Sequence, residues 1–542
     1  MRIAFVILLL ASSFPCLGQT NVLMYHNDPF HTGQNLSEKI LTPFNVNPGR
    51  FGKLFVLAAD GKVEGQPLYV AGLNMPDLGV HNVVFAVSEH DSVYAYDADQ
   101  PGAPLWQIST ISSDETPADT QGCSQVEPEV GITATPVIDL AAGRHGTIYL
   151  VSMSKDSLGN YHQRLHALDI TDGQEEFGGP VEIAATFPGN GDASIGGTLY
   201  FNPRMYKERA ALVLSNGVVY TSWASHCDIR PYTGWVIGFD QYTLSQTLAF
   251  NFTPDGEGGT IWGAGAGPAV DAEGRLYFQL ANGTFDPDLD VLGFPYHGNF
   301  GNAFVKLSVD GRVPSVIDYW TMHDSVVESD ADADLGSGGI MILPDVVDND
   351  GTVHHLGAGA GKDGNIYVFD RDNMGKFDPN SNNAIYQVLP SALPSAELAA
   401  PAWFNGMVYF GAIDDRIRAY TMIGARLSTA PAAFTPKTFG YPGTTPSISA
   451  DGNDNAILWA LENSNPVVLH AYDAANIGIE LYNTRMTDGR DDAGPGTKWI
   501  PPTIADGKVF VPTGTGVAVF GLLEQVNVDA RPRPHPAGLV PD

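Results

Sequence analysis

Short apolar segments separated by turns recur along most of the chain, and they belong to a longer repeating unit. A unit opens with an apolar run that often carries proline, continues through a second apolar run, and ends on an aromatic–Ala–x–Asp pattern or a variant of it. The first copy runs from residue 65 through residues 83–85 to residues 94–97. Alternating or continuous apolar runs of this length are typical of strands packed between neighbouring sheets. No segment shows the 3.6-residue period of an amphipathic helix.

Eight copies of this unit lie between residues 66 and 523. Each spans fewer than about 60 residues, the size of a four-stranded propeller blade with its loops. The later copies begin near Ala134, Ala211, Gly267, Gly339, Ala400, Thr445 and Pro502. We therefore predict an all-β fold, an eight-bladed β-propeller of four-stranded antiparallel blades that counts as one domain. Seven blades are the alternative, because the third and fifth copies are irregular.

The two ends of the repeat region suggest how the ring closes. The last copy lacks an outer strand after Phe520, and the apolar run from Lys53 to Leu57 could supply it. Pairing of the N-terminal and C-terminal strands would leave no open sheet edge. We assign residues 19–525 to the propeller and residues 526–542, which are rich in Pro and Arg, to a flexible C-terminal tail.

The first 18 residues have the features of a signal peptide. Arg2 provides a positive start, residues 3–11 are apolar, and small residues precede Gln19. The apolar run is too short to span a bilayer, and no later segment is long and apolar enough to do so. We expect an exported protein, periplasmic or extracellular. A lipid anchor on Cys16 stays open as an alternative.

Charge and cysteine content narrow the function further. The formal net charge of −33 argues against nucleic acid and anionic membrane surfaces as partners. Beyond the signal peptide the chain has two cysteines, Cys123 and Cys227. An even number in an exported protein permits a disulfide, and two separate buried thiols are the alternative. We predict that the two form one disulfide after export.

Two segments carry a family resemblance. Residues 94–97 (Tyr-Ala-Tyr-Asp), with Gly102 and Trp106, resemble a tryptophan docking motif. Residues 361–371 (Gly-Lys-Asp-Gly-Asn-Ile-Tyr-Val-Phe-Asp-Arg) resemble a Lys-x-Gly-x-x-Tyr-Val-x-Asp-Arg strand. Both motifs are typical of the quinoprotein alcohol dehydrogenase-like superfamily, whose enzymes hold pyrroloquinoline quinone and calcium over the propeller axis. The resemblance extends over nearly the whole chain after the signal peptide.

The resemblance implies cofactor-binding residues at four positions. Glu64 and Thr133 lie where the family contacts the quinone, and Lys362 matches the lysine near the quinone oxygens. Asn282 resembles the asparagine that binds calcium. Pyrroloquinoline quinone and calcium are therefore the cofactors that the resemblance implies. Because the four residues come from the first, second, fourth and fifth blades, we expect them to converge near the propeller axis.

Departures from the family pattern leave catalysis unassigned. The family's catalytic aspartate precedes an asparagine, and that step reads Gly301-Asn302 here. The family's vicinal cysteine pair is absent, and its calcium-binding glutamate has no clear counterpart around residues 152–159. Our first hypothesis is an exported propeller that binds a small molecule, glycan or protein at its channel face. A quinone- and calcium-dependent alcohol or sugar dehydrogenase is the alternative, and a polysaccharide lyase or hydrolase is the third.

Other polar residues give less specific candidates. His297, His323 and Asp324 lie in long loops between strands. They are the acid–base candidates if the chain is an enzyme that does not use quinone. Three alternating aspartates resemble the start of a calcium loop, and a solvated acidic loop is the other interpretation: Asp330, Asp332 and Asp334. A cluster near the N-terminus could bind a metal, although hydrogen bonding within a loop is the simpler interpretation: His26, Asp28 and His31.

Overall fold

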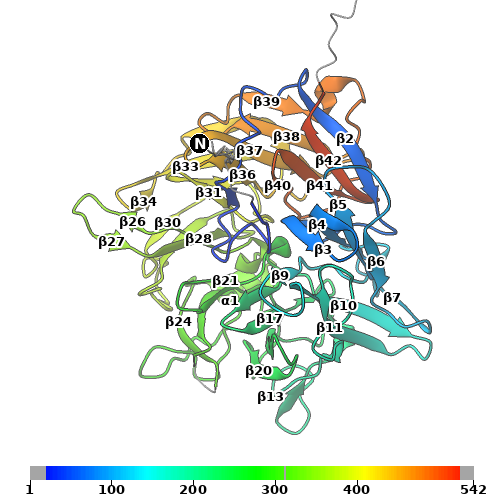
Figure 1. Cartoon of the computed structure of the whole chain (residues 1–542). Coiled ribbons are helices and arrows are strands. Elements are labelled where there is room, and N and C mark those ends of the chain that lie inside the picture. The colour runs from blue at the N-terminus through cyan, green and yellow to red at the C-terminus, as the bar shows by residue number, and fades with distance from the viewer. Residues whose placement is uncertain (1–19, 311–312, 525–542) are drawn as a thin grey trace, which may run out of the picture.

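Eight sheets arranged radially around a central axis make up the structure (Figure 1). It is a computed structural model that describes residues 20–310 and 313–524. The predicted signal peptide and C-terminal tail lie outside the described residues.

The first four blades consist of β3 (Leu68–Met75), β4 (Gly79–Val87), β5 (Ser92–Asp97) and β6 (Trp106–Ser109); β9 (Val137–Asp139), β10 (Thr147–Asp156), β11 (Tyr161–Asp169) and β12 (Val181–Glu182), extended by β7 (Glu115–Asp119) and β8 (Glu129–Val130); β16 (Val213–Ser215), β17 (Val218–Ser222), β19 (Trp235–Asp240) and β20 (Gln246–Asn251); and β21 (Ala269–Val270), β22 (Leu276–Gln279), β23 (Ala303–Ser308) and β24 (Ser315–Thr321).

The other four blades follow in chain order and complete the predicted count of eight. They consist of β25 (Met341–Ile342), β28 (Leu356–Ala360), β29 (Ile366–Asp370) and β30 (Gln387–Leu389); β31 (Ala402–Phe404), β32 (Met407–Phe410), β33 (Asp415–Ile423) and β35 (Ala433–Phe439), with β34 (Arg426–Leu427) beside β33; β36 (Ser447–Asp451), β37 (Asp454–Glu462), β38 (Val468–Asp473) and β39 (Glu480–Asn483), with β1 (Gln34–Asn35) parallel to β36; and β40 (Thr503–Ala505), β41 (Lys508–Thr513), β42 (Gly516–Leu522) and β2 (Phe51–Ala58). The eight-bladed prediction is confirmed.

Few elements lie outside the blades. The remaining strands are β13 (Thr186–Pro188), β14 (Thr198–Tyr200), β15 (Tyr206–Lys207), β18 (Ala224–Ser225), β26 (Val346–Val347) and β27 (Val353–His354). The α-helix of the described ranges is α1 (Ser325–Asp330), and short 3-10 turns are η1 (Pro203–Met205), η2 (Gly263–Gly265), η3 (Leu335–Ser337) and η4 (Thr484–Thr487). Across residues 20–310 and 313–524, no helix has the length and apolar character needed to cross a membrane.

The two ends of the chain close the ring as predicted. β2 pairs antiparallel with β42 as the outer strand of blade 8, with Lys53 opposite Phe520 and Val56 opposite Ala518. Blade 8 therefore combines three C-terminal strands with one N-terminal strand. This pairing closes the ring, because blade 8 cannot be completed without the N-terminal strand.

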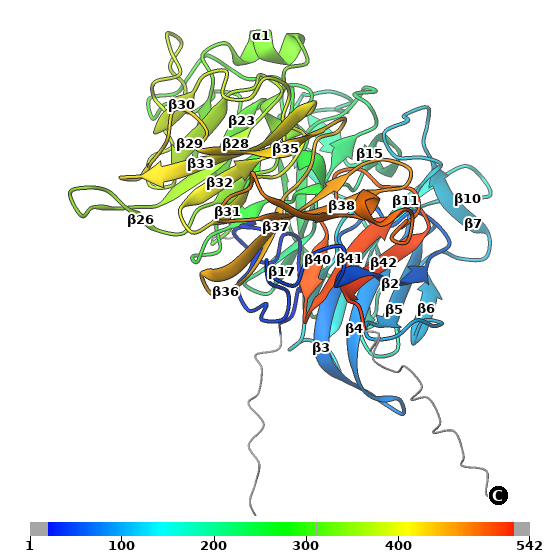
Figure 2. The ribbon, with the colours of Figure 1, turned by 90° about the horizontal axis from the view of Figure 1, so that it is seen from above.

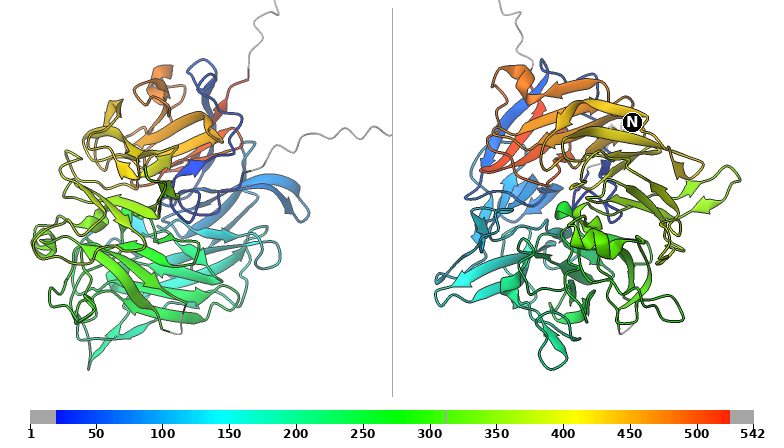
Figure 3. Two further views of the ribbon diagram at one scale, coloured as in Figure 1. Left: turned by 90° about the vertical axis from the view of Figure 1, so that its left-hand side faces the viewer. Right: turned by 180° about the vertical axis from the view of Figure 1, so that it is seen from behind.

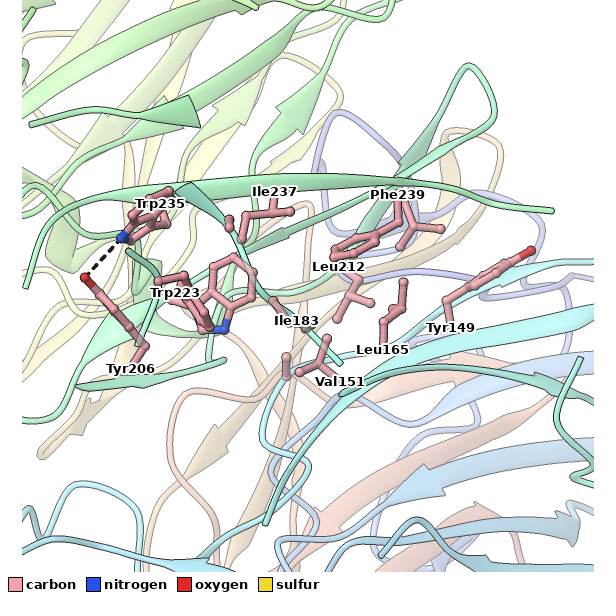
Figure 4. Close-up of a cluster of buried hydrophobic side chains, with 14 of the residues drawn as sticks. Tyr149, Val151, Leu165, Ile183, Tyr206, Leu212, Trp223, Trp235, Ile237 and Phe239 are labelled. Carbon is pink, nitrogen blue, oxygen red and sulfur yellow. Dashed lines mark hydrogen bonds between the residues drawn. The ribbon is translucent and has the colours of Figure 1, made fainter. Parts of the chain in front are cut away.

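The hydrophobic core lies between neighbouring blades. The cluster between blades 2 and 3 joins Tyr149 and Leu165 of blade 2 to Ile237 and Phe239 of blade 3 (Figure 4). Each blade buries both of its faces in this way, which explains why many of its strands are apolar without alternation. The repeating apolar runs of the sequence are thus the inter-blade core.

Trp106 docks blade 1 onto blade 2. Its indole Nε1 donates a hydrogen bond to the Ile170 carbonyl at 3.0 Å. Its ring lies against Gly173, where an added Cβ would come 2.8 Å from a ring carbon. Gly173 also has a positive φ of 71°, which favours glycine. The tryptophan docking motif therefore fixes the spacing between these two blades.

The N-terminal segment closes one end of the central channel. It lies at the centre of the ring in Figure 1, and it bonds to the inner strands of successive blades. Five backbone hydrogen bonds of 2.7 to 2.9 Å run from the blades to carbonyls of this segment. They are Ile138 to Leu23, Val270 to Pro29, Ile342 to Phe30, Trp403 to Thr32 and Ile448 to Gly33, with the N–H donor named first. Tyr25 is fully buried among alanines of this region. α1 lies at the opposite side of the ring (Figure 2), and the views of Figure 3 show the blades from further sides. The N-terminal segment and α1 therefore lie on opposite sides of the ring.

Candidate functional site

Two adjoining hollows lie near α1, whose residues line the outer one. The inner cavity has a volume of about 50 Å³ and the outer hollow about 390 Å³, and both are lined by Asp228, Asn282 and Asp332. A site of about 50 Å³ holds a few water molecules. The residues of the inner cavity used below are Gln125, Lys207, Arg209, Trp262, Asp334, Lys362 and Trp499. They come from several blades, so the site exists only in the closed ring.

Arg209 forms the bottom of the inner cavity and is 2% exposed. Its Nη1 donates hydrogen bonds to the carbonyls of Glu64 at 2.8 Å and Thr133 at 2.5 Å. Its Nη2 donates to the Lys498 carbonyl at 3.0 Å and lies 3.6 Å from the Glu64 carboxylate. Glu64 and Thr133 are therefore held at the bottom of the site through Arg209, and neither of them lines the cavity itself.

Two buried donors at this end lack partners among the described residues. They are the Nε of Arg209 and the Nε1 of Trp499. The Arg209 guanidinium lies 5.5 Å from the Trp499 ring centre, which places the two side chains together. A buried donor without an acceptor costs about 1–3 kcal/mol. A ligand that supplies an anionic acceptor would remove this cost.

Lys207 and Lys498 add positive charge to the same end. Lys207 is 3% exposed, and its Nζ donates to Cys123 Sγ and Gln125 Oε1, both at 3.4 Å. No carboxylate of the described residues lies within 4.0 Å of this Nζ. Burial, followed by the Arg209 cation, lowers the pKa of Lys207 to about 8. Lys498 Nζ bonds to the Gln125 carbonyl and lies 5.4 Å from the Trp499 ring centre. This end of the site therefore holds three cations, Lys207, Arg209 and Lys498, beside the carboxylate of Glu64, in a strongly acidic protein.

The opposite side of the cavity holds two of the predicted residues. Lys362 Nζ lies 2.6 Å from Oδ1 of Asp332 and 2.6 Å from Oδ1 of Asp334. Asn282 Nδ2 donates to the same Asp332 oxygen at 2.9 Å. Asn282 Oδ1 is buried without a hydrogen-bond donor among the described residues. Asp332 thus joins Asn282 and Lys362 at one point.

Asp334 is a buried carboxylate that faces this cavity. Burial raises its pKa, and the Lys362 cation opposes that shift. Trp262 Nε1 donates to its Oδ2 at 3.1 Å. The alternating aspartates do not lie on a strand, because α1 ends at Asp330 and Asp332 has a φ of 57°. Asp332 and Asp334 form ion pairs with Lys362, a role that neither interpretation of the sequence anticipated.

The Gly301–Asn302 step has no room for an acidic side chain. A Cβ on Gly301 would lie 2.3 Å from the carbonyl carbon and oxygen of Gly283. Asn302 Oδ1 accepts a hydrogen bond from the Leu335 N–H at 2.6 Å and so fixes the loop that carries Asp332 and Asp334. The carboxylates Asp332 and Asp334 therefore come from the loop after blade 4. At Gly301 the backbone of Gly283 fills the space that a side chain would need.

The loop candidates lie away from both hollows. His297, His323 and Asp324 line neither of them. His297 Nδ1 is 3.7 Å from Asp255 Oδ2, and His323 Nδ1 is 3.3 Å from Asp324 Oδ1. The structure does not bring these three residues to Asn282 or Lys362.

The N-terminal histidines stabilise the loop that closes the channel. The His26 ring nitrogens bond to the carbonyls of His31 at 2.9 Å and Pro446 at 2.8 Å. Asp28 accepts hydrogen bonds from the N–H groups of Phe30 and Thr32. These hydrogen bonds lie within the loop and between the loop and Pro446. In the part of the chain that the structure describes, no group of three or more His, Cys, Asp or Glu side chains is placed to hold a metal.

A Ser–His–Glu arrangement in blade 2 also lies away from the site. Ser152 Oγ is 2.9 Å from His166 Nε2, and His166 Nδ1 is 2.5 Å from Glu175 Oε1. Ser152 is only 1% exposed and lines neither hollow. Because a nucleophile must reach its substrate, this network stabilises the blade and gives no support to a hydrolase.

The predicted disulfide between Cys123 and Cys227 is confirmed. The two Cα atoms lie 5.5 Å apart, and 104 positions separate the cysteines in sequence. Cys227 lines the inner cavity together with Gln125 and Val126, which follow Cys123 closely. The disulfide therefore ties the loop between β7 and β8 of blade 2 to the loop before β19 of blade 3 at the cavity wall.

Comparison with known proteins shows a similarity of fold. No family model and no curated protein matches the chain. A quinohemoprotein alcohol dehydrogenase from Pseudomonas putida HK5 aligns with a TM-score of 0.59 and 16% identity, over 93% of this chain and 80% of the other. The quinohemoprotein alcohol dehydrogenase from Comamonas testosteroni gives 0.59 and 14% over the same shares. A europium-containing methanol dehydrogenase gives 0.55 and 13%, over 92% and 90%. The chain has a quinoprotein-like fold.

Proposed function

We propose that this chain is a quinoprotein-like propeller that binds a carboxylate-bearing aromatic ligand, of the pyrroloquinoline quinone type, at its channel face. One observation carries the proposal. The closed bottom of the inner cavity holds two buried donors that have no acceptor among the described residues, Arg209 Nε and Trp499 Nε1. Lys207 and Lys498 flank them in a chain of net charge −33. Charge-assisted hydrogen bonds to a carboxylate are the strongest way to satisfy such donors.

The shape and walls of the site favour a flat ligand. The rings of Trp262 and Trp499 lie 5.9 Å apart at 78° and give the cavity an aromatic wall. Because the inner cavity holds only a few water molecules, a ring system would extend into the outer hollow. Arg209 would hold a carboxylate at the bottom, and Lys362 would lie beside the part nearer the entrance. A bound quinone would supply a two-electron acceptor.

Calcium fits these residues less well. Calcium takes six to eight oxygen ligands. At this site Asn282 Oδ1 is an oxygen without a donor, whereas Asp332 and Asp334 are paired with Lys362. We therefore propose binding of the organic anion without a resident calcium ion, and Asn282 as a calcium ligand stays a prediction.

Oxidation of an alcohol or sugar is a second candidate function, and Asp334 favours it. A general base works best with a pKa near the working pH, and burial raises the pKa of Asp334 towards that range. Asp334 would take the alcohol proton, the role that the Gly301–Asn302 step cannot fill. This candidate requires a bound quinone as the hydride acceptor.

Export to the periplasm or the cell exterior is part of the proposal. The disulfide between Cys123 and Cys227 supports it, because disulfides persist in oxidising compartments. Glycans and proteins are other partners that the channel face could take, and the cationic bottom favours a small anion over both.

Titration of the purified protein with pyrroloquinoline quinone, with and without calcium, tests the proposal. Quenching of tryptophan fluorescence reports binding, because Trp262 and Trp499 form the cavity wall. We expect saturable quenching. Lys207→Met should weaken binding about tenfold or more, since a charge-assisted hydrogen bond contributes about 1.5–3 kcal/mol. The matched control Lys39→Met changes an exposed lysine and should leave the affinity unchanged.

The same samples separate the two candidate functions. Absence of quenching in the folded wild type, or equal affinity of Lys207→Met and wild type, would reject the binding proposal. Dye reduction with a series of alcohols and sugars is then measured on the quinone-loaded protein. Binding without turnover supports the binding function. Turnover that Asp334→Asn abolishes while quenching persists would establish the dehydrogenase.

A further inference from the structure

Lys207 is a buried amine in the inner cavity, and the proposed function uses it only as a cationic hydrogen-bond donor. We propose that it is also a nucleophile that captures carboxylate-bearing aldehydes and ketones as imines. This inference needs no quinone, although it shares the cationic end of the cavity with the proposed function. It assigns a covalent site to a residue that neither the sequence motifs nor the fold likeness single out.

The position of Lys207 makes its amine available to a ligand in the cavity. It lies on β15, whose pairing with β18 places Ala224 opposite Lys207, and both residues line the inner cavity. Within residues 20–310 and 313–524, the Nζ has two hydrogen-bond acceptors, Cys123 Sγ and Gln125 Oε1, both at the long distance of 3.4 Å. No ion pair among the described residues holds the ammonium in place. The amine is therefore shielded from bulk water and free to meet a ligand.

The surroundings favour the neutral, nucleophilic form of the amine. Burial lowers the pKa of Lys207 from 10.5 to about 8. A buried lysine whose pKa falls in this way is the usual activated form for carbonyl chemistry. The charged and titratable groups that face it are the cations Arg209 and Lys498, the carboxylates Glu64 and Asp228, and the imidazole of His226. At pH 8 its neutral fraction should exceed that of an ordinary lysine on the order of 100-fold.

The chemistry balances without an oxidant or a reductant. The nitrogen lone pair attacks the carbonyl carbon, a C–N bond forms, and the carbonyl oxygen takes a proton. The two protons of the neutral amine are thus transferred to the oxygen, the C–O bond breaks, and the oxygen leaves as water while a C=N double bond forms. The reaction is reversible, so the imine persists only while the ligand is held.

Arg209 selects the class of carbonyl compound. Its unpaired Nε can donate to a ligand carboxylate, and Trp499 Nε1 provides a second donor beside it. A neutral aldehyde leaves both donors unpaired, whereas an anionic one satisfies them. Oxo acids and carboxylated aldehydes are therefore the favoured class.

Reductive trapping on the full, disulfide-bonded protein tests the inference. The probe is 4-carboxybenzaldehyde, its matched neutral control is benzaldehyde, and cyanoborohydride reduces the imine so that peptide mass spectrometry locates it. We expect Lys207 to be modified at least about tenfold faster than the exposed Lys39, with a rate that rises as the pH passes through about 8. The carboxylated probe should react about tenfold faster than benzaldehyde. Lys207→Arg should lose this modification, and circular dichroism checks its fold.

The outcomes distinguish this inference from the proposed function. Modification spread over surface lysines, with Lys207 unmodified in the folded wild type, would overturn the inference. Equal rates with the two aldehydes would overturn the role of Arg209. Quinone quenching on the same sample is the separate readout. Quenching without trapping at Lys207 rejects the imine alone, and trapping without quenching rejects the quinone proposal alone.

Discussion

Removal of the disulfide by Cys123→Ser with Cys227→Ser should lower the melting temperature by a calculable amount. The cysteines are 104 positions apart. In the chain-entropy model, a cross-link over a loop of this length stabilises the folded state by about 4.7 kcal/mol at 25 °C. Unfolding about 500 ordered residues at about 2.1 cal/mol/K per residue gives an entropy of about 1.1 kcal/mol/K. The expected shift is therefore about 4 °C.

Differential scanning calorimetry of the non-reduced proteins measures this shift. The single variant Cys227→Ser is the matched control, because it breaks the same bond and should melt close to the double variant. A shift below about 1 °C would show that the unfolded chain gains little freedom when the bond is absent. A decrease in melting temperature several times larger than about 4 °C would show that the bond also maintains the cavity wall. Either result would refute the entropic reasoning.

Three further single substitutions should change the stability of the protein. Trp106→Phe loses the hydrogen bond to the Ile170 carbonyl and should lower the free energy of unfolding by about 1 kcal/mol in urea titrations. Gly301→Asp should destabilise the fold by about 3 kcal/mol or more, measured by calorimetry, and should not create a base, because the Gly283 backbone fills the space. Burial raises the pKa of Glu89 from 4.5 to about 8, so the folded wild type should lose stability as the pH rises from about 4.5 to 8; in Glu89→Gln, urea titrations at pH 5 and 8 should show a smaller difference.

Much of the fold could be predicted from sequence because it repeats. The apolar runs recur once per blade, and their repetition predicts the number of sheets without knowledge of any single contact. The ring closure followed from a missing strand after Phe520 and an unassigned one at residues 53–57. The segment that closes the channel, around residues 22–35, was not predicted. It has no period, and its backbone bonds reach across several blades, so no local pattern marks it.

The site could be predicted only in part. The family resemblance singled out Asn282 and Lys362, which line the cavity. Glu64 and Thr133 do not line it, and their backbone carbonyls accept hydrogen bonds from Arg209, which no motif marks. Arg209 immediately precedes the apolar run Ala-Ala-Leu-Val, and a charge directly before a buried strand is the signal that could have indicated it. Other residues of the site come from a two-residue strand outside the blades, which carries Lys207, and from loops, which carry Asp334 and Trp499. Their convergence depends on the closed ring.

The central claim is that a ligand carboxylate satisfies the unpaired donors Arg209 Nε and Trp499 Nε1 at the closed bottom of the channel. Calorimetric titration with pyrroloquinoline quinone and with its trimethyl ester measures this contribution directly, because the ester keeps the ring system and removes the negative charges. Loss of one or two charge-assisted hydrogen bonds at about 1.5–3 kcal/mol each should weaken binding of the ester at least about tenfold. Equal affinity of the acid and the ester would contradict the claim.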